Sequence, residues 1–532
     1  MSKGSLKLTR IKRLLVWLTV IIIGLPVILA LANVKDQPVN SSHKVFIAFG
    51  FHVNLYHSFR NDTNDDSGFG KDIRVIRHII RTLDRYNEKG VPVKGIWDFD
   101  NLFSLQEILP RYAPDIIENI RRRVHENGDE VILMSYNNGL VSAMTEDELN
   151  NAVKWSISNP WQSGVEDLFG KFSPIVRPQE MMTTPGNFSI YKKYGVKAVS
   201  LYYSATPFDT FRVFSRPLNW TEGHNPMMYH HPKTKEEMVI IPTYHFGDLM
   251  EHVSLKHWVA ELKERQEKGI LKQDALISIN FDADSELWEG IDLPWTMEWL
   301  PNTGGIGALV REVADLPNVV FTTLGEYLAE HPPVGSFSFS QDTADGSFNG
   351  YNSWAEKADS SRYWTSIERN RHTCEAARKA MRILPEALPT TQLENLLTFA
   401  EMMRLRALST TNFGMATPFL ARQREQVMDG IVANLDNYSD QLERLMTAGL
   451  QSHLRQYPSQ IKDNTDFKLL DTIMVLQPGK QTQLKGNRFV KLNDFDMYQP
   501  YKHFALIRSD GKVIPTTNFK VKKEQGKTRQ LT

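Results

Sequence analysis

The sequence has almost no cysteine and no net charge, and each of these absences excludes a class of protein. Its single cysteine, Cys374, rules out an intramolecular disulfide framework and a cysteine-based zinc site. Lysine plus arginine total 62, and so do aspartate plus glutamate, so the composition gives no electrostatic reason to expect a nucleic-acid or strongly acidic partner. With 532 residues, 41% of them hydrophobic, the chain can bury a large core and is expected to form two or three domains.

Charged residues are missing from one long apolar run, residues 14–32, which is long enough to cross a bilayer. The preceding segment, residues 1–13, is basic and contains no acid, so the positive-inside rule keeps the N-terminus in the cytoplasm. We expect a membrane anchor, or alternatively a signal peptide cleaved after Ala30-Leu-Ala32. In both cases the rest of the chain lies outside the cytoplasm, and we expect it at a bacterial inner membrane, facing the periplasm.

Strand-like and helix-like segments alternate from residue 44 to about residue 330, after a polar tether at 33–43. Apolar runs such as 44–51 and 275–281 are typical of buried strands, and helical spacing of apolar residues follows several of them. Strands that alternate with helices pair in parallel through right-handed crossovers. Seven or eight such units over residues 44–330 predict an α/β fold. They fit a closed (β/α)7-type barrel better than an open sheet, which periodicity alone does not exclude.

Three shorter parts are expected after the barrel. Residues 331–362 are rich in glycine, serine and aromatic residues and predict an active-site loop. Residues 363–455 have the apolar spacing of a helical domain. Residues 456–532 predict a C-terminal β element of short strands, with a hairpin turn at Asp510-Gly511 and a basic tail.

Two acidic residues, Glu180 and Asp282, each follow a short strand-like run. The C-terminal ends of barrel strands are where side chains converge on a substrate. Two carboxylates at that end are the minimal machinery for glycoside cleavage, about 5–5.5 Å apart for retention or about 6.5–9.5 Å apart for inversion. The structural alternative is that an acid after a strand caps the next helix.

Groups that can bind a sugar stand near the same strand ends. His52 follows the first strand, Trp97 and Asp98 end the second, and Trp288 follows Asp282. Indole rings can stack on sugars, while histidine and carboxylate groups can hydrogen-bond their hydroxyls. The alternatives are a structural, hydrogen-bonded His52 and a Trp97 that belongs to the core.

The histidines between residues 224 and 257 do not form a metal-binding pattern. None of them pair at helical i, i+4 spacing with a glutamate in the metalloprotease pattern, and no combination of aspartate and histidine ends the first strand. We therefore expect scattered surface histidines, no metal and no cofactor. His245, which follows a strand-like run, is the one histidine in this group that stays a candidate for the site.

The order of the motifs resembles glycoside hydrolase family 57, a group of α-glucan-active enzymes with an incomplete (β/α)7 barrel, of which this chain would be a divergent member. Phe51-His-Val-Asn-Leu-Tyr-His57 resembles the family's histidine-rich first-strand motif. The strand that includes Glu130 resembles the family's Gly-x-Glu strand. Arg177-Pro-Gln-Glu-Met-Met182 resembles the nucleophile strand, and Asn280-Phe-Asp-Ala-Asp284 resembles the Phe-Asp-x-Glu motif.

This resemblance implies roles for individual residues. Glu180 would be the nucleophile and Asp282 the acid/base. Leu324-Gly-Glu-Tyr-Leu328 and Leu408-Ser-Thr-Thr-Asn-Phe413 resemble the segments that follow the barrel and close its mouth. The substrate contacts would come from His52, Trp97, Asp98, Glu130, Asp284, Trp288, Trp354 and Asn412.

The chain also departs from the family pattern at positions that contact sugars. Pro-Gln precedes Glu180 where an aromatic residue and proline are usual, Asp284 stands where glutamate is frequent, and Asn412-Phe413 replaces an Asp-Trp pair. These departures argue against starch-type specificity. A membrane tether suits an envelope or secreted polysaccharide better than a storage glucan.

We therefore expect a membrane-tethered, metal-independent retaining glycoside hydrolase or transglycosylase that acts on a poly- or oligosaccharide and binds no nucleic acid. A polysaccharide deacetylase is one alternative, weakened because the chain has no His-x-x-x-His. A metal-dependent α-mannosidase is weakened because the first strand lacks a His-x-Asp pair. The third alternative is a non-catalytic polysaccharide-binding or assembly protein on a degenerate barrel.

Overall fold

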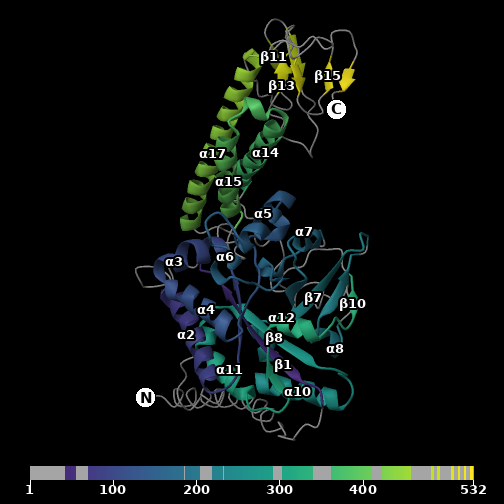
Figure 1. Cartoon of the computed structure of the whole chain (residues 1–532). Coiled ribbons are helices and arrows are strands. Elements are labelled where there is room, and N and C mark those ends of the chain that lie inside the picture. The colour runs from purple at the N-terminus through teal and green to yellow at the C-terminus, as the bar shows by residue number, and fades with distance from the viewer. Residues whose placement is uncertain are drawn as a thin grey trace, which may run out of the picture. The chain divides into compact units, whose positions relative to one another are not determined.

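The computed structural model describes eight long segments of the chain and six short strands near its C-terminal end. The long segments are residues 42–55, 70–184, 186–203, 218–231, 233–290, 302–338, 361–409 and 422–456. The chain divides into two compact units, Met1–Trp354 and Ala355–Thr532 (Figure 1). The division falls inside the stretch 331–362, where the sequence predicts a loop.

Seven parallel strands of the described residues form a closed ring in the first unit. Around the ring they follow the order β1, β2, β3, β4, β5, β7, β8 and back to β1. Single parallel bridges, Leu133 to Val176 and Tyr244 to Ile279, join β3 to β4 and β7 to β8. The predicted α/β class with a parallel sheet is confirmed. The bounds are β1 Val45–Val53, β2 Gly95–Phe99, β3 Glu130–Val131, β4 Ile175–Val176, β5 Ala198–Tyr202, β7 Glu237–Thr243 and β8 Ala275–Asp282.

Three further strands extend this ring. β6 (Met227–His230) pairs antiparallel with β7, and β10 (Ser336–Phe337) pairs with β6. β9 (Val319–Phe321) pairs in parallel with the first residues of β1.

Helices lie around the strands, as the alternating pattern predicts (Figure 1). On α2 the residues Ile73, Ile76, Ile80 and Leu83 recur at helical spacing, and all four are buried because that spacing places them on one face. The α-helices of this unit are α2 Gly70–Glu88, α3 Leu109–Tyr112, α4 Pro114–Glu126, α5 Glu146–Ile157, α6 Val165–Phe169, α7 Asn187–Lys193, α8 Trp220–Gly223, α9 Phe246–Glu251, α10 Leu255–Glu267, α11 Gly305–Val313 and α12 Leu324–Glu330. Short π- or 3₁₀-helical turns are η2 Asn101–Ile108, η3 Val141–Ala143, η4 Gln179–Met181 and η5 Glu286–Trp288.

The interior of the ring changes from apolar to polar along the strands. Successive side chains of a strand point to opposite faces, so residues two apart share the inner face. The apolar layer is formed by Phe46, Ala48, Ile96, Ile132, Ile175, Ala198, Ile241, Leu276, Leu324 and Tyr327, the last two from α12. Beyond it, the same face of the strands other than β3 carries the polar layer, which consists of His52, Asp98, Arg177, Ser200, Tyr202, Thr243, Asn280 and Asp282.

The second unit contains long helices and short antiparallel strand pairs. Its helices are α14 Ser361–Ile383, α15 Thr390–Ala407 and α17 Arg422–Gln456, with the short turn η7 at Pro385–Ala387. Apolar side chains of all three long helices pack together, and a buried arginine, Arg404, donates to the amide oxygen of Asn370. This agrees with the helical C-terminal region that the sequence predicts. The strand pairs are β11 Gln481–Leu484 with β12 Arg488–Lys491, β13 Ala505–Ile507 with β14 Val513–Pro515, and β15 Lys520–Lys522 with β16 Thr528–Gln530.

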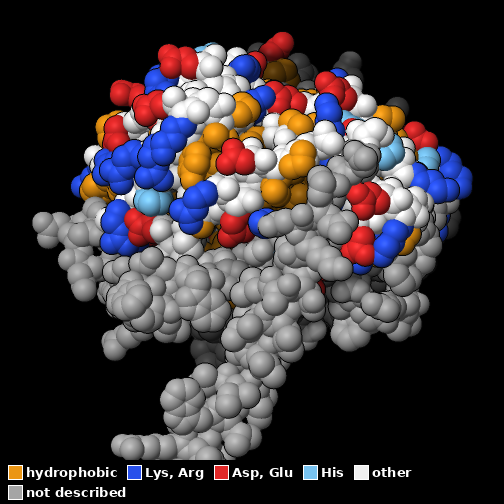
Figure 2. Space-filling view, turned by 90° about the horizontal axis from the view of Figure 1, so that it is seen from below, with side chains coloured by type: hydrophobic (Ala, Val, Ile, Leu, Met, Phe, Trp, Pro, Cys, Tyr) orange, Lys and Arg blue, Asp and Glu red, His pale blue; other side chains and the backbone are white. Residues whose placement is uncertain are grey.

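The membrane anchor or signal peptide predicted at 14–32 lies outside the described residues and stays a prediction. Within the part of the chain that the structure describes, none of the helices is both long and apolar enough to cross a membrane. On the face shown in Figure 2, lysine and arginine side chains are intermixed with aspartate and glutamate, in keeping with the balanced composition.

Gly50 gives the first testable prediction, because it lies beside Asn280 across β1 and β8 and a Cβ there would overlap the Asn280 side-chain nitrogen. We expect Gly50→Ala to displace Asn280 from the polar layer and to lower the free energy of unfolding by about 1–3 kcal/mol. Denaturant titration of the purified protein measures this. Gly307→Ala, on α11 with only ordinary contacts around it, is the matched control and should be neutral or slightly stabilising. Equal effects of the two changes would contradict the packing described here.

Candidate active site

Four polar side chains in the barrel form one continuous hydrogen-bonded chain. His52 Nδ1 donates to Asp98 Oδ1 at 2.5 Å, and Asn280 Nδ2 donates to Asp98 Oδ2 at 3.2 Å. Arg177 Nε donates to Asn280 Oδ1 at 3.0 Å. These residues come from β1, β2, β8 and the residue just after β4, so the chain joins strands from different parts of the sequence.

The strand register explains why these residues meet. His52 lies between Asp98 on β2 and Asp282 on β8, directly opposite both. All three side chains therefore face the interior in one row across neighbouring parallel strands. Gly50, two residues before His52, is opposite Asn280 and leaves room for the Asn280 amide.

Burial and charge determine the ionisation of this group. His52, Asp98, Arg177 and Asn280 are each at most 4% exposed. Burial alone would raise the pKa of Asp98, but the charges of His52 and Arg177, with hydrogen bonds from His52 and Asn280, lower it below its ordinary value. Burial works against the charged Arg177 as well, yet the carboxylates of Asp98 and Asp282 raise its pKa above the ordinary value. Asp98 and Arg177 are therefore both charged inside the barrel.

Glu180 lies in a strained turn three residues beyond Arg177. Its backbone has φ 52° and ψ 28°, and Met181 has φ 52°, so two consecutive residues other than glycine adopt the left-handed region. Such residues cost about 1–3 kcal/mol each and cluster at functional sites. Gln179 donates its side-chain amide to Glu180 Oε1 at 3.0 Å. The half-buried carboxyl group is thus held near the end of β4.

Asp282 is fixed from both sides at the end of β8. Its backbone carbonyl accepts a hydrogen bond from the indole nitrogen of Trp288 at 2.9 Å. The next residue, Ala283, donates its backbone N–H to the carbonyl of His52 at 2.8 Å. Asp284, two residues on, is 8% exposed. These contacts lock the backbone that carries the Asp282 carboxyl group at the barrel mouth.

The two tryptophans predicted to stack on a sugar do not face the barrel interior. Trp97 and Trp288 are fully buried, with ring centroids 4.8 and 4.9 Å from that of Phe51, which points to the outer face of β1. Trp97 also donates to the carboxylate of Asp129, outside the barrel. Because both rings pack on the outer side of β1, away from the polar layer, the predicted stacking role is wrong for both. Trp288 instead supports Asp282.

Glu130 lies at the wrong end of its strand for the predicted substrate contact. It is the first residue of β3, and its carboxylate accepts the backbone N–H groups of Leu324 and Gly325 at the start of α12, at 3.0 and 2.8 Å. Ser173, which precedes β4, also donates to it. Its oxygens are therefore used in joining α12 to the N-terminal ends of the strands. Trp354 and Asn412, the remaining predicted contacts, lie outside the described residues.

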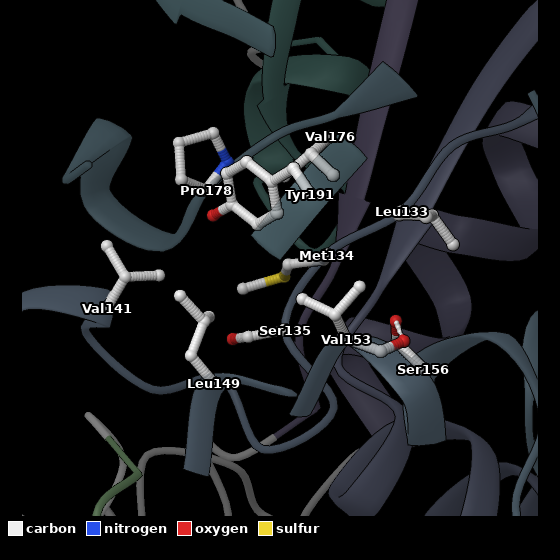
Figure 3. A pocket seen from close by; sticks show the side chains of 10 residues that line it. All are labelled: Leu133, Met134, Ser135, Val141, Leu149, Val153, Ser156, Val176, Pro178 and Tyr191. Atoms are coloured by element: carbon white, nitrogen blue, oxygen red, sulfur yellow. Dashed lines mark hydrogen bonds between the residues drawn. The ribbon is translucent and has the colours of Figure 1, made fainter. Parts of the chain in front are cut away.

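A small apolar cavity is lined in part by Val176 and Pro178, which precede Glu180 in the sequence (Figure 3). Its lining includes Met134 and Pro178 from strand ends, Leu149 from α5 and Tyr191 from α7. The centre of a water molecule can occupy only about 10 Å³ of it, which is enough for about one water and far too little for a sugar ring. The cavity is a packing gap and not a substrate site.

The histidines show no metal-site geometry in the described part of the chain. Within those residues, no group of three or more histidine, cysteine, aspartate or glutamate side chains is arranged to hold a metal ion. His245 caps α9, where its Nδ1 accepts the backbone N–H of Gly247 at 2.7 Å, and its ring packs against Tyr202.

Five residues of the polar layer were not among the residues that the sequence predicts for the site, namely Arg177, Ser200, Tyr202, Thr243 and Asn280. The guanidinium of Arg177 lies over the Tyr202 ring, and the Tyr202 hydroxyl donates to the backbone carbonyl of Asn280 at 3.2 Å. The signal that identifies them is alternation: Arg177 is two residues after the inward Ile175, and Tyr202 is four after the inward Ala198.

Comparisons with known proteins give a likeness in structure and none in sequence. No family model matches the chain, and no curated protein matches it. The α-amylase AmyC from Thermotoga maritima has a TM-score of 0.51 at 11% identity, over 76% of this chain and 95% of that one. An α-mannosidase from Enterococcus faecalis has a TM-score of 0.50 at 10% identity, over 77% of this chain and 43% of that one.

A GH57 branching enzyme from Thermococcus kodakaraensis is also similar, with a TM-score of 0.49 at 12% identity, over 79% of this chain and 92% of that one. At these identities the amylase and mannosidase likenesses establish a shared fold. Because the two share this barrel but differ in their named activities, the fold alone does not select a reaction.

The placement of Glu130 gives a prediction about stability. Burial raises its pKa from 4.5 to about 7, although the hydrogen bonds from Ser173 and the start of α12 oppose that rise. The folded state therefore holds a proton that the unfolded state loses above pH 4.5, so stability falls as the pH rises from 4.5 to 7. At about 1.4 kcal/mol per pKa unit the loss is about 3 kcal/mol.

We expect Glu130→Gln to remove this decline, which denaturant titrations from pH 4.5 to 7.5 measure. Glu118→Gln, on the exposed face of α4, is the control and should keep the wild-type pH dependence. A Glu130→Gln protein with the full wild-type decline would show that another group causes it.

Proposed function

We propose that this protein is a carbohydrate-active enzyme, a retaining glycoside hydrolase or transglycosylase, with Glu180 as nucleophile and Asp282 as acid/base. The observation that carries the proposal is the polar layer at the C-terminal ends of the parallel strands, above a fully apolar layer. This is the end at which barrel enzymes bind their substrates. Glu180 on its strained turn and Asp282 beside His52 both belong to this end.

The reaction would proceed in two steps. In the first, a carboxylate oxygen of Glu180 bonds to the anomeric carbon while the glycosidic bond breaks, and the departing oxygen takes the proton of Asp282. In the second, the Asp282 carboxylate takes a proton from water or from an acceptor hydroxyl, whose oxygen attacks the same carbon and releases Glu180. Water gives hydrolysis, and a sugar acceptor gives transfer.

The neighbours of Asp282 support the second of these steps directly. Asp282 and the buried Arg177 attract each other, which favours the ionised carboxylate that must accept a proton. The first step needs the protonated form, so the bound sugar has to reduce this attraction. The substrate itself is therefore expected to complete the acid function of Asp282.

The resemblance to glycoside hydrolase family 57 and the fold shared with an α-amylase and an α-mannosidase support a proposal for the substrate class. We propose an α-linked poly- or oligosaccharide. The apolar run at 14–32 adds the proposal that the enzyme is tethered to a membrane and acts outside the cytoplasm on an envelope or secreted polysaccharide.

The central test is the loss of activity in Glu180→Gln and Asp282→Asn. On soluble α-glucans and α-mannans, followed by reducing-end release and product chromatography, we expect a fall of at least about 10²–10⁴-fold for each. Glu118→Gln and Asp315→Asn, two exposed acids, are the matched controls and should keep wild-type rates.

Two other results would contradict the proposal. Activity that survives in both variants would remove these residues from the reaction. Glycan binding that is untouched by Glu180→Gln, together with no turnover by the wild type, would favour the non-catalytic binding protein. That alternative has some support in the burial of Trp97 and Trp288.

The stereochemistry of the product gives a separate prediction. A covalent intermediate on Glu180 requires two displacements, so the first-formed sugar should keep the α configuration of the substrate. Proton NMR during the first minutes of hydrolysis distinguishes the two anomers. An initial β anomer would mean a single displacement by water and would exclude Glu180 as nucleophile.

A further inference from the structure

The hydrogen-bonded chain in the barrel ends at two nitrogens that have no hydrogen-bond partner among the described residues. One is His52 Nε2, and the other is Arg177 Nη1. His52 is 1% exposed and Arg177 is 4% exposed, so protein surrounds both side chains. Buried polar atoms are almost always hydrogen-bonded, and an exception calls for an explanation such as a ligand. Both side chains belong to the polar layer at the barrel mouth.

The hydrogen bonds within the chain fix what each end can do. Asp98 is ionised and can only accept, so His52 donates through Nδ1 and, when neutral, has a lone pair at Nε2. Asn280 donates to Asp98 and accepts from Arg177, which sets the orientation of its amide. Arg177 Nη1 is a donor. One end therefore accepts a hydrogen bond and the other end donates one.

We propose that His52 Nε2 and Arg177 Nη1 bind one hydroxyl group of the sugar, and that Arg177 is thereby a specificity-determining residue. The hydroxyl donates to His52 and accepts from Arg177, and it is the substituent of neutral sugars that does both. This inference rests on the proposed function, since it assigns the substrate of that site. It adds a residue, Arg177, that the sequence did not predict for the site.

The charges around Arg177 favour a neutral hydroxyl over the substituents of charged sugars. The carboxylate of Asp98 already neutralises the guanidinium, so the carboxylate of a uronate would add a negative charge that nothing there balances. A carboxylate also cannot donate to His52 Nε2, and an ammonium group cannot accept from Arg177. The site therefore selects a neutral sugar.

The first measurement uses the full-length protein without substrate. In protein labelled with ¹⁵N-histidine at pH 8.5, the His52 resonances, assigned with His52→Gln, report which nitrogen holds the proton. We expect the proton on Nδ1. A proton on Nε2 would overturn the inference, whether or not the protein cleaves any glycoside.

The second measurement identifies the hydroxyl. The probes are 4-nitrophenyl α-D-glucopyranoside and α-D-mannopyranoside with their 2-, 3-, 4- and 6-deoxy forms, and the corresponding uronides. For the wild type we expect kcat/KM to fall by at least about 100-fold for one deoxy position, because that analogue leaves two buried groups unpaired. In Arg177→Met that selectivity should shrink to less than about 10-fold, and Arg177→Lys should retain part of it.

Arg123→Met is the matched control, because Arg123 is also a fully buried arginine but pairs with Asp129 outside the barrel. It should keep the wild-type selectivity even if it lowers stability. Equal selectivity in wild type and Arg177→Met, or a wild-type preference for the uronides, would overturn the inference.

If no glycoside is cleaved, failure of the proposed function can still be distinguished from failure of this inference. In that case the proposed function fails, and calorimetric binding of the methyl glycosides and their deoxy forms judges the inference separately. A loss of affinity at one deoxy position that depends on Arg177 supports it. Affinity that is the same for all analogues, or absent, overturns it.

Discussion

The pairing of two buried charges, Asp98 and Arg177, is the constraint on which the polar half of the barrel depends. Removing a carboxylate and a guanidinium from water is costly, and attraction between them compensates only when their remaining groups are hydrogen-bonded. Here Asn280 bridges the two, and His52 satisfies the other oxygen of Asp98. The bridge in turn requires a residue without a Cβ at position 50. Four strands are thus tied to one electrostatic arrangement, which holds His52 and Asp282 in fixed positions.

The rest of the first unit supports that arrangement. Below the polar layer, apolar side chains from seven strands and from α12 fill the ring, so water does not reach the charges from that end. Glu130 secures α12 by accepting its first backbone N–H groups. Trp97 and Trp288 cover the outer face of β1, and Trp288 also holds the backbone of Asp282. The tryptophans and Glu130 therefore act on the site through structure.

The barrel could be predicted from the sequence because its strands are continuous apolar runs separated by amphipathic helices, and both patterns depend on neighbours along the chain. The roles of Trp97 and Glu130 could not. Trp97 and Asp98 are adjacent, so a one-residue difference decides which of them faces the interior, and only the strand register fixes it. The resemblance implies a substrate contact for Glu130, but β3 begins at this residue, so its side chain lies at the opposite end of the strand from the polar layer.

The role of Arg177 could not be predicted from the sequence for a different reason. Its position before Glu180 is visible in the sequence, but its value to the site depends on Asn280, about a hundred residues away, and on the carboxylate of Asp98. Such a network becomes evident only when the ring is closed. The strained backbone at Glu180 and Met181 is likewise invisible in a sequence that contains no glycine there.

The claim that Glu180 forms a covalent bond with the sugar is the centre of this account. It is tested most directly by treating the protein with a 5-fluoroglycosyl fluoride of the α configuration and locating the adduct by peptide mass spectrometry. The account predicts one glycosyl group on the peptide that contains Glu180, and its loss in Glu180→Gln. An adduct on another residue, or substrate cleavage with no adduct at all, would contradict it.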